Sequence, residues 1–155
     1  MVEKPSLCQI PEYNVSCVGC CKVDAYDSRE ELIEAIRKNT TEYRALMDMN
    51  PAIEQKEKFF DMGANIDRDS GLCSLLIYLD EAETRVGCAA HPNIHGVDYR
   101  IKFNLCNTPY ECKHSKKFSN LSGSKRKLIL QRLQKEYKGD WIRLSIDMEE
   151  ERIKL

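Results

Sequence analysis

Eight cysteines in 155 residues are the feature that most constrains this chain. They are Cys8, Cys17, Cys20, Cys21, Cys73, Cys88, Cys106 and Cys112. No basic stretch leads into an apolar run at the start of the sequence, so we expect a cytoplasmic location, where thiols stay reduced. A spaced cysteine cluster in that setting indicates metal or redox chemistry. Adjacent Cys20 and Cys21 could bond to each other only with strain, which disfavours the alternative of a disulfide-stapled secreted protein.

The densest cluster is Cys17-Val18-Gly19-Cys20-Cys21. Two cysteines separated by two residues can turn both sulfurs toward one ion, and Gly19 lets the backbone reverse tightly between them. A thioredoxin-like redox role is the competing use of this spacing. That motif begins a helix that follows a strand, and no strand pattern precedes Cys17. The spacing therefore favours a metal site.

The remaining candidate ligands are distant in the sequence. Cys73 and Cys88 flank a predicted hairpin, which would bring both thiols to one end, and Cys106 and Cys112 follow later. His91 lies three residues after Cys88, a workable ligand spacing, although an ordinary loop histidine is an equal alternative. We therefore predict that the metal ligands come from the eight cysteines and His91.

Four other polar residues are weaker candidates. His95 and His114 have no evident partner in the sequence. Asp98 and Arg100 could support a metal site through hydrogen bonds to its ligands, but a surface ion pair is the commoner reason for such a pair.

The cysteine arrangement resembles the CxxCxxCC family of zinc- or iron-chelating domains, whose members carry eight cysteines. The resemblance extends from Cys8 to Cys112 and rests on Cys17-Val-Gly-Cys20-Cys21, Gly71-Leu72-Cys73, Gly87-Cys88 with nearby Pro92, and the pair Cys106 and Cys112. The family has a cysteine three residues before the cluster, where this sequence has Asn14. Either Cys8 fills that ligand position, or the cluster has one close ligand fewer. The resemblance implies metal chelation, and it extends to flagellin lysine methylases, which leaves an enzymatic role open.

The number of cysteines is compatible with more than one metal. Eight thiolates could hold about two tetrahedral zinc ions, or one four-cysteine iron–sulfur cluster with thiols left over. The ferredoxin spacing is absent because Cys21 directly follows Cys20. We predict a metal-binding protein that uses zinc or iron, including an iron–sulfur cluster. An iron–sulfur-dependent enzyme or electron-transfer protein is the alternative, although no phosphate-binding loop, HExxH motif or Ser/His/Asp arrangement supports an enzyme.

Charge and hydropathy indicate few partners beyond the metal. The chain has 24 basic and 25 acidic residues and a formal net charge of -1, so no global field attracts nucleic acid. The basic run over residues 113–127 is best explained as a solvated face. No stretch approaches the length of a transmembrane segment, so we expect no membrane partner, while a protein partner is left open.

The hydrophobic pattern predicts an α+β fold: one small domain over residues 1–155, with a mainly helical body, a short β-hairpin and cysteine-rich loops organised around metal. Predicted helices cover residues 28–38, 41–49, 52–62 and 124–138, and the hairpin joins residues 72–80 to 85–90. Ser28 and Glu31 form a capping box for the first helix. The predicted inward positions of the third helix are Ile53, Phe59 and Phe60. The apolar positions of the last helix are Leu128, Leu130, Leu133 and Tyr137.

Three segments are less regular. Residues 93–107 carry Tyr99, Ile101 and Phe103 in an alternation typical of a strand. Residues 113–124 are polar and predict a linker or exposed loop. The tail from Trp141 fits a helix or a strand.

Overall fold

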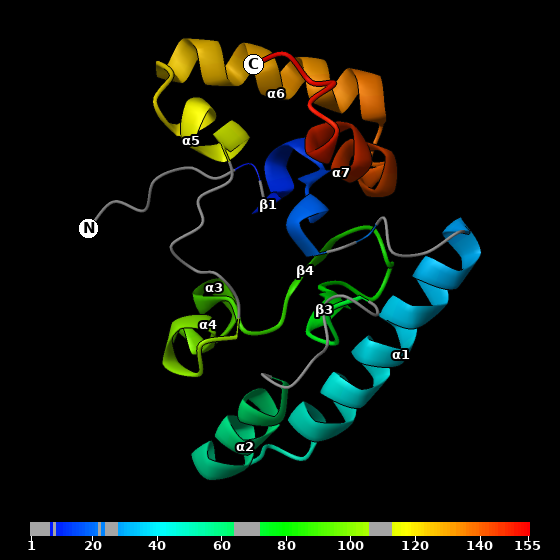
Figure 1. The fold of residues 1–155 in the computed structure, drawn as a ribbon, viewed down its shortest axis with the longest axis vertical. Coiled ribbons are helices and arrows are strands. Elements are labelled where there is room, and N and C mark those ends of the chain that lie inside the picture. Colours follow the sequence, from blue (N-terminus) through cyan, green and yellow to red (C-terminus); the bar gives the residue numbers. More distant parts are fainter. Residues whose placement is uncertain (1–6, 8, 22, 24–27, 64–71, 106–112) are drawn as a thin grey trace. The chain divides into compact units, whose positions relative to one another are not determined.

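The computed structural model describes residues 7, 9–21, 23, 28–63, 72–105 and 113–155 (Figure 1). Helices predominate over two short antiparallel sheets, which confirms the predicted α+β class with its mainly helical body and short hairpin. The chain divides into two compact units. The first unit comprises residues 1–24, 79–87 and 111–155, and the second comprises residues 25–78 and 88–110. That they act as one metal-binding domain stays a prediction.

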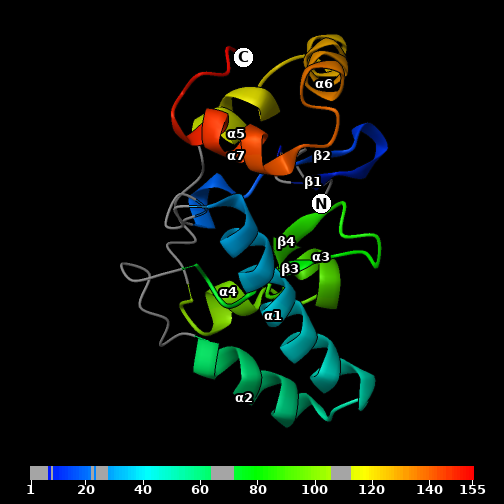
Figure 2. The ribbon, with the colours of Figure 1, turned by 90° about the vertical axis from the view of Figure 1, so that its right-hand side faces the viewer.

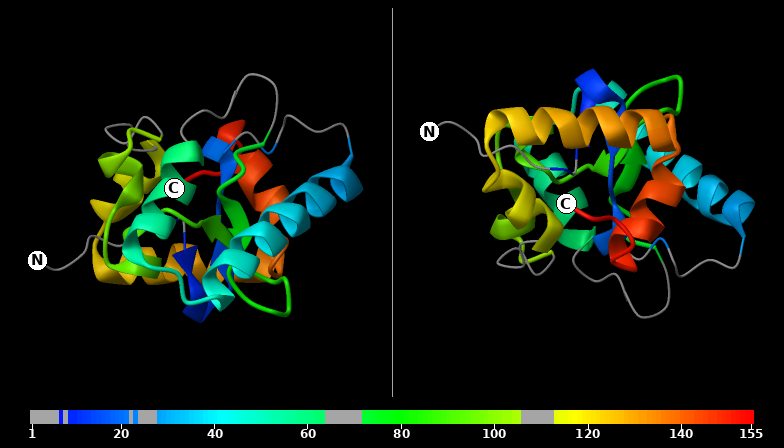
Figure 3. Two further views of the ribbon diagram at one scale, coloured as in Figure 1. Left: turned by 90° about the horizontal axis from the view of Figure 1, so that it is seen from below. Right: turned by 90° about the horizontal axis from the view of Figure 1, so that it is seen from above.

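The first unit combines short N-terminal strands and turns with three helices from the C-terminal third. Its elements are β1 (Gln9–Ile10), η1 (Pro11–Tyr13), β2 (Val15–Ser16), η2 (Gly19–Cys21), α5 (Lys113–Ser119), α6 (Gly123–Tyr137) and α7 (Trp141–Glu149). β1 and β2 pair antiparallel, with Ile10 opposite Val15. Both α6 and α7 contact β2, as Figure 2 and Figure 3 show. A short strand thus precedes Cys17, which corrects the expectation that none does.

Helix α6 begins and ends close to its predicted bounds. The Ser122 hydroxyl caps it and accepts from the Lys125 N–H at 3.4 Å. Leu133 faces the core and is 1% exposed, but Leu128, another of the predicted apolar positions, is 66% exposed. The apolar stripe of α6 is therefore narrower than the sequence suggests.

Helix α5 contradicts the predicted linker over residues 113–124. Most of its side chains are polar, but Phe118 is fully buried and joins the core of the first unit. Phe118 and the buried Ser115 thus fix one side of a helix whose three lysines are exposed. The core residues of this unit are Leu7, Val15, Phe118, Leu130, Leu133, Tyr137, Leu144, Met148 and Ile153.

The tail from Trp141, which the sequence left ambiguous, forms helix α7. The Asp140 carboxylate caps α7 and accepts from the Arg143 N–H at 3.2 Å. The buried residues of α7 are Trp141, Ile142, Leu144, Ser145 and Met148. Burial of this face stabilises α7 as a helix rather than a strand.

The second unit is built from two longer helices, a strand and two short helices. Its elements are α1 (Arg29–Asp48), α2 (Ile53–Gly63), β3 (Leu76–Tyr78), α3 (Pro92–His95) and α4 (Tyr99–Lys102). α1 packs against β3. β3 pairs with β4 (Val86–Cys88) in the second sheet, which confirms the predicted hairpin.

Helix α1 corrects the prediction of two separate helices over residues 28–49. It is 20 residues long and passes through the expected break without interruption. The Thr40 hydroxyl donates to the Ile36 carbonyl at 2.6 Å and accepts from the Tyr78 N–H at 2.9 Å. Thr40 therefore joins α1 to β3 from inside the helix instead of interrupting it.

The ends of α1 agree with the sequence. The Ser28 hydroxyl accepts from the Glu31 N–H at 3.1 Å, which confirms the predicted N-terminal cap. Asn50 has a left-handed φ of 47°, and Pro51 follows it, so the helix cannot continue.

Two further predictions in the second unit are wrong. Ile53 is 67% exposed, because it stands in the first turn of α2 while Phe60 fills the buried position. The alternating residues Tyr99, Ile101 and Phe103 do not form a strand, since residues 99–102 are helix α4. Tyr99 stacks on the Phe60 ring with centroids 4.4 Å apart, and this packing selects the helix.

None of the described helices is long and apolar enough to cross a membrane.

Candidate metal centre

The cysteine cluster lies at a tight turn in the first unit, which we call the knuckle (residues 17–21). β2 leads directly into Cys17, and η2 carries the chain from Gly19 to Cys21. The Cys21 N–H donates to the Val18 carbonyl at 2.9 Å and closes the turn. Cys17 and Cys21 are both partly buried, and Cys17 packs against the core of the first unit. The two thiols thus stand at the surface of a folded turn.

Helix α7 holds the knuckle in place. The buried N–H of Val18 donates to the Ser145 hydroxyl at 3.0 Å, and Ser145 is fully buried. A Cβ placed on Gly19 would lie 2.8 Å from the Ser145 carbonyl oxygen, closer than non-bonded atoms approach. Glycine is therefore needed here for close packing of backbone on backbone.

Ser16 adds a second support just before the knuckle. Its buried hydroxyl donates to the Val86 carbonyl at 2.7 Å, which ties β2 to β4 within the first unit. The backbone leading into Cys17 is therefore anchored on both sides.

Cys73 lies shortly before β3 and Cys88 is the last residue of β4, and both cysteines belong to the second unit. The Ala89 N–H donates to the Leu75 carbonyl at 2.7 Å and marks where pairing ends. Asn39 of α1 donates through its side chain to the Cys73 carbonyl at 3.2 Å and fixes the entry to the hairpin. Cys73 and Cys88 are both partly exposed.

His91 follows Cys88 around a turn. The His91 N–H donates to the Cys88 carbonyl at 3.1 Å, and the His91 side chain is partly buried. The predicted spacing thus corresponds to a closed backbone turn in the second unit.

The rest of the predicted ligand set lies outside the described residues. This holds for Cys8, Cys106 and Cys112, and for the side chain of Cys20. Within the part of the chain that the structure describes, no three His, Cys, Asp or Glu side chains gather closely enough to hold a metal ion. The nine-ligand set therefore stays a prediction.

Asp98 and Arg100 form an ion pair with each other. The Arg100 guanidinium contacts both carboxylate oxygens of Asp98, at 2.9 Å and 2.6 Å. This hydrogen bonding with Arg100 holds the pKa of Asp98 below its usual value. The Asp98 carboxylate also accepts from the Arg100 N–H and caps α4. These contacts account for both residues without a metal.

The two other histidines have distinct surroundings that the sequence did not reveal. His95 lies among aromatic rings of the second unit, and its Nε2 is 3.1 Å from the Tyr43 hydroxyl. Burial lowers the pKa of His95. His114 lines a pocket in the first unit, where burial and the neighbouring lysines Lys113 and Lys117 lower its pKa. In the sequence, this pocket is indicated by the basic run over residues 113–127, which supplies Lys113 and Lys117 to its wall.

Comparison with known proteins finds no matching family, no matching curated protein and no matching solved structure.

Proposed function

We propose that this chain is a cytoplasmic metal-binding protein that holds zinc or iron, including an iron–sulfur cluster, through cysteines centred on the knuckle. The observation that supports the proposal is the way Gly19 and Ser145 fix a turn that carries Cys17 and Cys21. A ligand turn that is already folded loses little conformational entropy when the ion binds.

The donor chemistry fits thiophilic metals. Thiolates are the preferred ligands of structural zinc and of iron–sulfur clusters, and a tetrahedral site takes four of them. The knuckle sequence offers three thiols, so the proposal requires a fourth ligand from the remaining candidates. The candidates for the fourth ligand are Cys8, Cys73, Cys88, His91, Cys106 and Cys112. A bound metal ion with fewer than four protein ligands would contradict a closed structural site.

Substitution of a knuckle thiol tests the proposal. We expect Cys21→Ser to lower the metal content per folded chain, because serine is a far poorer ligand than thiolate for soft metals. Ser124→Ala is the matched control, because Ser124 is exposed near the start of α6 and the substitution keeps every thiol, so its metal content should be unchanged. Metal content that is unchanged in Cys21→Ser and Cys17→Ser alike would refute the knuckle as the centre of the site.

A further inference from the structure

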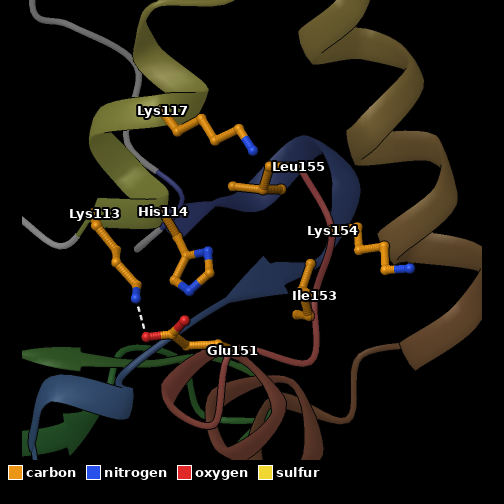
Figure 4. Close-up of a pocket in the computed structure, with 7 residues that line it drawn as sticks. All are labelled: Lys113, His114, Lys117, Glu151, Ile153, Lys154 and Leu155. Carbon is orange, nitrogen blue, oxygen red and sulfur yellow. Dashed lines mark hydrogen bonds and ion pairs between the residues drawn. The ribbon is translucent and has the colours of Figure 1, made fainter.

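A pocket of about 520 Å³ lies in the first unit between α5 and the segment that follows α7 (Figure 4). Lys113, His114 and Lys117 line it from α5, and Glu151, Ile153 and Leu155 line it from the opposite side. Figure 4 shows the His114 ring and the Lys117 amine pointing into the space, while the Lys154 amine points away from it. The pocket therefore combines cationic and apolar walls.

Two polar groups in the pocket have no protein partner among the described residues. The Nε2 atom of His114 is buried and makes no hydrogen bond there. The Lys117 amine forms no ion pair with any described residue. By contrast, Lys113 pairs with Glu151. A buried polar atom without a partner has lost the hydrogen bond that water would give it, and a ligand that supplies the missing partner restores that bond.

We propose that this pocket binds a small molecule that carries a phosphate group and an apolar portion. The Lys117 amine attracts the anion, and Ile153 and Leu155 provide apolar surface for the remainder of the molecule. None of the lining residues belongs to the predicted ligand set of eight cysteines and His91.

The chemistry of His114 favours phosphate over carboxylate. Nε2 accepts a hydrogen bond in one neutral tautomer of imidazole and donates one in the other. An ionised carboxylate can only accept, whereas a phosphate monoester near neutral pH carries both anionic and protonated oxygens, because its second pKa is about 6. Phosphate can therefore satisfy Nε2 in either tautomer.

Calorimetric titration of the full chain tests the proposal with three probes: phenyl phosphate, inorganic phosphate and benzoate. We expect phenyl phosphate to bind most tightly, because it alone combines a phosphate with an apolar ring. Benzoate that binds as tightly as phenyl phosphate would overturn the phosphate assignment. Inorganic phosphate that binds as tightly would overturn the apolar part.

Two lysine variants locate the binding. Lys117→Glu should weaken phenyl phosphate binding by about tenfold or more, as expected for loss of a charge-assisted hydrogen bond. Lys116→Glu is the matched control, because Lys116 is exposed on the same helix and does not line the pocket. Equal losses in both variants, or no saturable binding to the unaltered chain, would refute the site.

Discussion

The backbone N–H of Val18 donates a 3.0 Å hydrogen bond to the hydroxyl of Ser145, although 127 residues separate the two in sequence. Both partners are buried, so water cannot replace either one. This bond makes the position of the knuckle depend on α7. It also explains a serine in the middle of a helix face that is otherwise apolar.

Ser145→Ala should destabilise the first unit by roughly 1–3 kcal/mol, because it leaves the buried Val18 N–H without an acceptor. Urea denaturation measures the change. Ser124→Ala is the matched control, since Ser124 is exposed near the start of α6, and its stability should stay within about 0.5 kcal/mol. A Ser145→Ala protein as stable as the control would show that the bond contributes nothing.

Gly19→Ala should destabilise the chain by about 1–3 kcal/mol, because the new Cβ meets the Ser145 carbonyl oxygen and the knuckle must move away from α7. Gly123→Ala provides a matched control: a Cβ at Gly123 has nothing within 4 Å. Alanine has a higher helix propensity than glycine, so the Gly123→Ala protein should be as stable as the unaltered chain or more stable. Equal stability of the two variants in urea would contradict the tight packing at Gly19.

The sequence predicted those elements whose signals are local. Ser28 marks the start of α1 and Pro51 lies just beyond its end, and the turn between two apolar runs gave the β3–β4 hairpin. Errors arose where tertiary contacts decide. The sequence predicted a helix break between residues 38 and 41, but α1 continues through it, and the Thr40 hydroxyl accepts a hydrogen bond from β3. Tyr99 belongs to an alternation typical of a strand, but it stacks on Phe60 and lies in helix α4.

The same distinction applies to the candidate site. The spacing of Cys17 and Cys20, with Gly19 between them, predicted a tight turn, because the signal is contained within the knuckle. Ser145 could not be found that way, since nothing in a helix sequence shows which distant N–H a serine will serve. The pocket at His114 was equally hidden, because its apolar wall comes from a segment beyond the next two helices.

His95 should titrate below the ordinary value of 6.5, because burial and the nearby Lys56 both disfavour its charged form. A pKa that is lower in the folded than in the unfolded chain contributes stability above pH 6.5, and this contribution is lost as the pH falls through the folded pKa. NMR titration of the ring protons measures the value directly.

Lys56→Gln should raise the pKa of His95 by removing a nearby positive charge. Lys58→Gln, an exposed substitution on the same helix, serves as the control and should leave it unchanged. A His95 pKa at or above 6.5 in the unaltered protein would contradict the buried environment that the structure gives it.

Elemental analysis of anaerobically purified protein, combined with visible absorption, tests most directly whether the cysteines hold a metal. Colourless protein with about two zinc ions per chain indicates structural thiolate sites, whereas brown protein with iron and acid-labile sulfide indicates a cluster. Either result supports metal binding by the cysteines. Folded protein without stoichiometric zinc or iron, with its eight thiols intact, would contradict it.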